Sequence, residues 1–177
     1  MIYTQHYNSP LGGMLIAADD IGLTGLWFDW QKYFANDLPE EHTEQETAII
    51  SQAKRWLDIY FEGREPDFMP PLHLIGSDFR KDVWDILLQI SYGQTTTYGD
   101  IARQLAEKRG LSKMSAQAVG GAVGHNEISI IIPCHRVVGT NGSLTGYAGG
   151  IDKKVKLLEL ERCDMNEFYV PKKGIAL

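Results

Sequence analysis

Two adjacent residues, Cys134 and His135, are the first candidates for chemistry in this sequence. A thiol is a strong nucleophile only as the thiolate, and a free pKa of about 8.5 leaves a few per cent ionised at neutral pH. A nearby imidazole raises that fraction, so this pair indicates a reactive thiol. The alternative is that Cys134 is a small buried core residue, and on spacing alone this commoner role is favoured.

His135 is suited to act as a base, but adjacent side chains diverge on an extended strand. A bridging water would connect the imidazole to the thiol. The base would also need a carboxylate to orient it. Glu161, near the end of the last predicted helix, is the candidate, and Glu159 and Asp164 compete with it.

The cysteine and histidine spacing does not predict a zinc site. Cys134, His135, His125 and Cys163 show no paired ligand pattern, so we expect no metal. Two cysteines in 177 residues do not form a disulfide framework either. The sequence is therefore interpreted as intracellular, reduced and cytoplasmic.

The elements that position these residues fall into two halves. In the first half, apolar patterns separated by turns predict an antiparallel meander of strands, and a 3.6-residue period predicts a helix. A stretch rich in Pro and Gly then reads as a linker. The ranges are strands at 2–7, 14–18 and 21–28, a helix at 46–61 and the linker at 64–76.

The second half is predicted to be mainly helical. Ser77, Thr97 and Ser115 each stand where a helix N-cap is expected, and Thr97 with Asp100 resembles a capping box. Two short helices joined by a polar segment are consistent with a helix-turn-helix. The predicted ranges are a helix from 77 to about 92, helices at 97–106 and 116–123, a buried apolar run at 128–132 and a last helix at 152–162.

Gly120 and Gly121 lie inside a predicted helix, where glycine costs about 1 kcal/mol relative to alanine. One reason for the pair is close approach of another backbone, such as a nucleic acid strand. The other is close helix–helix packing. The sequence favours neither.

Charge is unevenly distributed along the chain. The net charge is −6, but residues 1–77 carry four Lys/Arg against twelve Asp/Glu, whereas residues 78–177 carry thirteen against eleven. The second half could therefore face phosphates. No apolar run is long enough to span a bilayer, and the first residues lack a secretory pattern, so no membrane partner is expected.

Four strings in order resemble a known family, the O-6-alkylguanine-DNA alkyltransferases. The strongest is Ile132-Pro133-Cys134-His135-Arg136-Val137, which resembles the family's active-site signature. The resemblance is strong over 77–177 and looser over 1–76. The other strings are Ala118-Val119-Gly120-Gly121-Ala122 with Asn126, Gly146-Tyr147-Ala148-Gly149-Gly150 before a helix ending at Glu161, and Thr97-Tyr98-Gly99-Asp100-Ile101-Ala102.

The resemblance implies an α+β fold with two domains. Residues 1–76 would form an N-terminal α/β domain with an antiparallel sheet, ribonuclease-H-like, ending in the linker. Residues 77–177 would form a mainly helical, winged-helix or helix-turn-helix domain that binds DNA and holds the active site. Family members place the second helix of the motif in the minor groove and flip the damaged nucleotide out.

The resemblance also implies the function: irreversible transfer of an alkyl group from O-6-alkylguanine in duplex DNA to Cys134, once per molecule. No cofactor is implied, and a monomer is expected. Repair of O-4-alkylthymine is left open. Two alternatives are a non-catalytic protein that binds alkylated bases, whose relatives lack the acceptor cysteine, and a thiol hydrolase.

Roles follow residue by residue from the resemblance. Cys134 is the acceptor, His135 the water-mediated base, Glu161 its orienting carboxylate and Tyr98 the donor to a guanine ring nitrogen. Asn126 braces the recognition helix against the active-site strand. The remaining residues are Ala116, Gln117, Ala118, Gly120 and Gly121 on the DNA-facing helix, Val137, Tyr147, Ala148 and Gly149 lining the pocket, and Arg136 as a structural ion-pair partner.

The sequence departs from the family in three places. Gln117 stands where many members insert an arginine into the base stack, so we expect altered flipping or DNA affinity. The connection at 106–114 is longer than usual and could shift the first helix on DNA. Glu127 replaces a common proline and is expected to oppose phosphate approach mildly.

Overall fold

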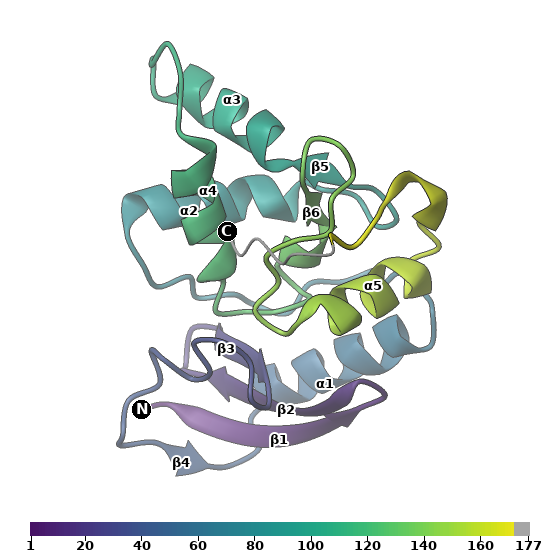
Figure 1. The fold of residues 1–177 in the computed structure, drawn as a ribbon. Coiled ribbons are helices and arrows are strands. Elements are labelled where there is room, and N and C mark those ends of the chain that lie inside the picture. The colour runs from purple at the N-terminus through teal and green to yellow at the C-terminus, as the bar shows by residue number, and fades with distance from the viewer. Residues whose placement is uncertain (172–177) are drawn as a thin grey trace. The chain divides into compact units, whose positions relative to one another are not determined.

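The computed structural model describes residues 1–171. Their contacts divide the chain into two units, one of residues 1–75 with 127–129, the other of residues 76–126 and those from 130 onward. The content is α+β, which confirms the predicted fold class (Figure 1). No helix among the described residues is long and apolar enough to cross a membrane.

The first unit is a four-stranded sheet with one helix packed against it (Figure 1). Strands β1 (Tyr3–Ser9), β2 (Gly12–Ala18) and β3 (Leu23–Phe28) form the predicted antiparallel meander, and β4 (Thr43–Glu44) pairs in parallel with β1. The helix is α1 (Ala48–Phe61), and it buries one apolar stripe. Alternate residues of β2 point to opposite faces, and both sets are buried, so the sheet is covered on both sides.

A short segment from the second half of the sequence, residues 127–129, belongs to the first unit. The Leu26 N–H donates to the Glu127 carbonyl, and the Ser129 N–H donates to the Leu26 carbonyl. The Glu127 carboxylate is buried and accepts from the Trp27 indole N–H at 2.8 Å. The expectation that Glu127 opposes phosphates was therefore wrong, because its charge is turned inward.

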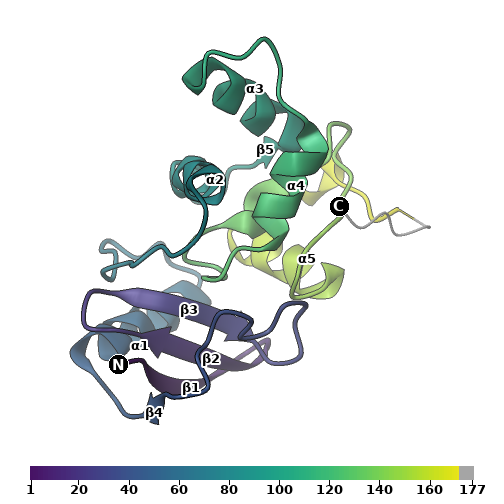
Figure 2. The same cartoon turned by 90° about the vertical axis from the view of Figure 1, so that its left-hand side faces the viewer.

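As far as residue 171, the second unit contains four α-helices and two short 3-10 helices. Helices α2, α3 and α4 pack on one another (Figure 2). Two two-residue strands pair in parallel. In chain order the elements are α2 (Asp78–Leu88), β5 (Thr96–Thr97), α3 (Tyr98–Lys108), α4 (Ala116–Gly124), η1 (Cys134–Arg136), β6 (Val137–Val138), α5 (Ile151–Leu160) and η2 (Met165–Glu167).

The predicted N-caps fix where three of these helices begin. The side-chain oxygens of Ser77, Thr97 and Ser115 each accept from the backbone N–H three residues later. Such bonds satisfy N–H groups that the first helical turn leaves without a partner. The three caps are confirmed, and those at Thr97 and Ser115 set where the two helices of the helix-turn-helix, α3 and α4, begin.

Candidate functional site

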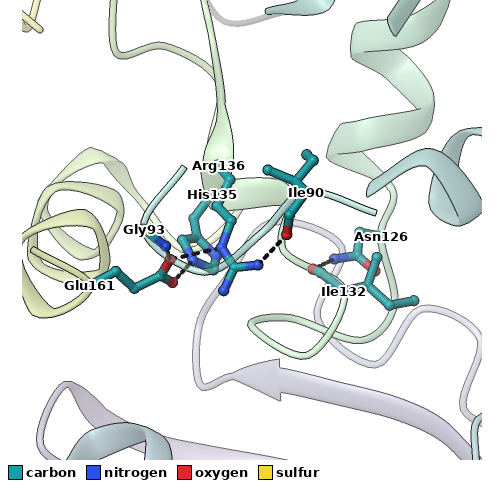
Figure 3. A network of polar contacts seen from close by, with 7 residues as sticks. All are labelled: Ile90, Gly93, Asn126, Ile132, His135, Arg136 and Glu161. Carbon is teal, nitrogen blue, oxygen red and sulfur yellow. Dashed lines mark hydrogen bonds and ion pairs between the residues drawn. The ribbon is translucent and has the colours of Figure 1, made fainter. Parts of the chain in front are cut away.

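The candidate nucleophile lies on a tight turn. Cys134 begins the 3-10 helix η1, so the expected active-site strand was wrong, although the run before it is buried as predicted. Asn126 holds this turn: its side-chain N–H₂ donates to the Ile132 carbonyl at 2.8 Å (Figure 3). The same N–H₂ also donates to Cys134 Sγ at 3.2 Å. The amide thus links the end of α4 to the sulfur itself.

Cys134 is 6% exposed, and burial raises the pKa of its thiol. The hydrogen bond from Asn126, the positive charge of Lys154 and the backbone N–H groups of Cys134 and His135 lower that pKa. A buried thiol needs both a base to remove its proton and charge to stabilise the resulting thiolate.

The base is in place. His135 and Glu161 are buried, and the imidazole Nε2 lies 2.5 Å from Glu161 Oε2 (Figure 3). Since a carboxylate only accepts, Nε2 carries the proton and Nδ1 carries the lone pair. The other two acids considered lie elsewhere, because Glu159 is exposed and Asp164 caps η2.

Glu161 is held by further donors. Its Oε1 accepts from Arg136 Nε at 2.7 Å and from the Gly93 N–H at 3.0 Å, while Arg136 also donates to the Ile90 carbonyl at 2.7 Å (Figure 3). Burial raises the Glu161 pKa, but the hydrogen bonds from His135 and Arg136 and the charge of the guanidinium outweigh it and bring the pKa to about 2. Glu161 therefore stays a carboxylate at neutral pH.

Burial lowers the pKa of His135, more than the bond to Glu161 raises it. The positive charges of Arg136 and Lys154 lower it further. A neutral imidazole with a lone pair at Nδ1 is the form that a base requires.

Tyr98, the first residue of α3, is buried, and its hydroxyl donates to the Thr145 carbonyl at 3.4 Å. Burial, together with the charge of Cys134, raises its pKa, so the phenol stays protonated and able to donate. The other residues expected to line the pocket come after Cys134 in the sequence. Val137 and Tyr147 are buried, and Ala148 and Gly149 are half-buried.

Sequence reasoning missed Lys154, which is fully buried in α5. Its Nζ donates to the carbonyls of Val137 at 2.5 Å and Thr145 at 2.9 Å. A signal existed: Lys154 and Glu161 share a helical stripe with two buried leucines, at the spacing i, i+3, i+4, i+7. The same stripe favours Glu161 over Glu159.

The outer face of α4, which we call its bare face, carries one long side chain, that of Gln117, among alanines and a glycine. Ala116, Gln117 and Ala118 are exposed, and a Cβ added to Gly121 would meet no atom within 4 Å. Gly120, by contrast, is buried. Each explanation for the glycine pair thus fits one glycine: packing fits Gly120, and an open surface fits Gly121.

The arrangement as a whole is a buried nucleophile with a base and an orienting carboxylate. Among residues 1–171, no group of three or more His, Cys, Asp or Glu side chains is arranged to hold a metal ion. The polar groups in hand, a thiol, a neutral imidazole, a carboxylate and a phenol, suit nucleophilic displacement with proton transfer.

Two family profiles match nearly the whole chain. One, described as 6-O-methylguanine DNA methyltransferase, DNA binding domain, matches residues 78–163. The other, described as the ribonuclease-like domain of the same enzyme, matches residues 2–74.

Known proteins are similar over most of their length. The methylated-DNA–protein-cysteine methyltransferase of Mycobacterium tuberculosis is 42% identical over 162 residues, 92% of this chain and 93% of that protein. That of Methanosarcina acetivorans is 41% identical over 160 residues, 90% of this chain and 98% of that protein. The crystal structure of the Mycobacterium tuberculosis OGT in complex with DNA is 39% identical, covers 94% of each chain and has a TM-score of 0.78.

Proposed function

The chain belongs to the 6-O-methylguanine DNA methyltransferase family, and from that membership we propose that Cys134 itself accepts the alkyl group of O-6-alkylguanine. The protein has the activity of a methylated-DNA–protein-cysteine methyltransferase, an enzyme that repairs DNA by direct alkyl transfer. One observation carries the residue assignment: the buried imidazole next to Cys134 is bonded to a carboxylate, which leaves its other nitrogen basic.

In the proposed first step, His135 Nδ1 takes the Cys134 proton through a bridging water. Glu161 holds the ring in the tautomer that keeps Nδ1 basic and stabilises the imidazolium that forms. The hydrogen bond from Asn126 then stabilises the thiolate.

In the second step, the thiolate sulfur attacks the alkyl carbon, a new S–C bond forms, and the bond from that carbon to O6 breaks. The electron pair remains on the guanine, and the Tyr98 hydroxyl donates its proton to a ring nitrogen. The proton held by His135 restores the Tyr98 phenol. The products are guanine and a thioether on Cys134, so each molecule acts once.

Duplex DNA is the partner of this chemistry, and α4 is proposed to enter its minor groove. The exposed Ala116 and Ala118 and the half-buried Gly121 support close approach of a strand, and Gln117 would occupy the gap left by the flipped nucleotide. We assign DNA binding and the active site to residues 77–177 and a supporting role to residues 1–76. We also propose that the protein acts as a monomer in the cytoplasm.

The test is an intact-mass measurement after incubation with duplex DNA containing one O-6-methylguanine. We expect one added methylene, located on the peptide that holds Cys134, and loss of the lesion from the DNA. Cys134→Ser should abolish transfer while DNA binding remains. Cys163→Ser, which changes the chain's other cysteine, should leave transfer intact.

The alternatives give different results in the same assay. Tight binding to the lesion without a change in mass would support a non-catalytic binding protein instead. Ester turnover without lesion removal would support a thiol hydrolase. Lesion removal by the Cys134→Ser variant would refute the assignment of the acceptor.

A further inference from the structure

A completely buried lysine is unusual, because removing an ammonium from water is costly unless other groups compensate. Lys154 is 0% exposed, in the first half of α5. Within residues 1–171, it forms no ion pair with a carboxylate. Its compensation comes instead from backbone carbonyls.

Those carbonyls belong to two different segments of the site. The Val137 carbonyl directly follows the 3-10 helix that carries Cys134, and the Thr145 carbonyl lies two residues before Tyr147 in the loop leading to α5. The Thr145 carbonyl is also the acceptor for the Tyr98 hydroxyl. The Lys154 ammonium therefore links the turn that carries Cys134 to the loop whose Thr145 carbonyl accepts from Tyr98.

We propose that Lys154 is a positioning residue of the alkyl-transfer site, whose buried charge stabilises the Cys134 thiolate while its hydrogen bonds tie the pocket loop to the nucleophile's turn. This rests on the proposed function of Cys134. It adds a group outside the set of nucleophile, base, carboxylate and proton donor.

The electrostatics of the site agree with this role. Burial lowers the pKa of Lys154 to about 8, and the charge of Cys134 raises it, while Lys154 in turn lowers the pKa of the thiol. The other charged or titratable groups of the site are His135, Arg136, Glu161, Tyr98 and Tyr147. Arg136 is already bonded to Glu161, so Lys154 is the cation left to compensate a thiolate.

The test measures thiol ionisation without DNA, so that it does not depend on repair activity. Iodoacetamide labels Cys134 at a rate that follows its thiolate fraction, and mass spectrometry of the Cys134 peptide reports that rate between pH 6 and pH 10. We expect Lys154→Gln and Lys154→Met to move half-maximal labelling to higher pH by about one unit or more. Lys156→Gln, an exposed lysine of the same helix, should match the unchanged protein.

The two Lys154 variants separate charge from bonding. Glutamine keeps N–H groups that can donate to the two carbonyls, whereas methionine keeps neither donors nor charge. If charge matters, both variants shift the labelling profile. If only the hydrogen bonds matter, Lys154→Gln restores the profile of the unchanged protein, and the thiolate-stabilising role is refuted.

A second measurement needs no variant. In protein with ¹³C-labelled lysine, the Lys154 side chain is titrated by NMR before and after Cys134 is blocked with iodoacetamide. Blocking removes the thiolate, so the Lys154 titration midpoint should fall. An unchanged midpoint would overturn the proposal. Failure of methyl transfer from DNA with a normal midpoint shift would instead count against the proposed function alone.

Discussion

The polar network around Glu161 and the outer face of α4 belong to the same unit but are built in opposite ways. Glu161 accepts bonds from a ring nitrogen, a guanidinium and a backbone N–H, all within 3.0 Å and away from solvent. The face of α4 from Ala116 to Gly121 presents an amide side chain, methyl groups and hydrogen atoms to solvent.

The difference separates two tasks. Proton transfer needs groups fixed to within a fraction of an ångström before substrate arrives, and bonding from several elements provides that. Contact with a DNA strand needs the absence of obstructing side chains, which small residues provide without bonds of their own. The network should therefore be sensitive to single atoms, and the helix face should respond to bulk and charge.

The largest effect is expected from Glu161→Gln, which breaks the network while keeping its shape. The amide cannot accept at both positions, so His135 loses its fixed tautomer and Arg136 loses its counter-charge. We expect single-turnover methyl transfer at saturating DNA to slow by about 100-fold or more. Urea unfolding should show a loss of about 3 kcal/mol, since a buried charge is left without its partner.

The matched control is Glu159→Gln, an exposed acid two residues earlier in α5, which should change neither rate nor stability. The pH dependence has a defined sign. Glu161 has a pKa of about 2 in the folded protein against about 4.3 unfolded, so its stabilisation is present above about pH 4 and lost as pH falls toward 2. A stability gap between the two proteins that stayed constant across that window would contradict the network's role.

The sequence predicted the helix-turn-helix and its caps because those signals are local. Thr97 and Ser115 need only their own next three residues to cap a helix. The partnership of His135 and Glu161 was one of three possibilities from the residues alone, since it joins positions 26 apart. It became specific only through the resemblance and, afterwards, the geometry.

Two features could not be predicted because their causes are not local. Residues 128 and 129 read as part of the apolar run 128–132, but the Glu127 carbonyl and the Ser129 N–H pair with Leu26, about 100 residues earlier. Lys154 was not singled out from the sequence, where it is one of three lysines in the predicted last helix. Its burial depends on carbonyls at Val137 and Thr145 that only the folded chain brings to it.

A smaller effect is expected from Gln117→Arg, which adds charge to the bare face. If α4 meets the DNA backbone, affinity for undamaged duplex should rise about tenfold at low salt, and the salt dependence should steepen by about one ion. Transfer at saturating DNA should change little. Filter binding across a salt series measures the affinity and its salt dependence. The control for net charge is Gln45→Arg, at an exposed position of the first unit. Equal gains in both variants would show that the position on α4 is not special.

The smallest and most discriminating change is Gly121→Ala, which adds one methyl group to the bare face. Because that methyl meets no protein atom within 4 Å, the helix should gain up to about 1 kcal/mol in unfolding free energy. DNA affinity should fall several-fold, since the same methyl would occupy space that a strand needs. Gly124→Ala, at the helix end and equally unobstructed, tests whether the loss is confined to the part of α4 near Ala116. Higher stability with unchanged affinity would place the DNA elsewhere, and the contrast between network and face would lose its functional meaning.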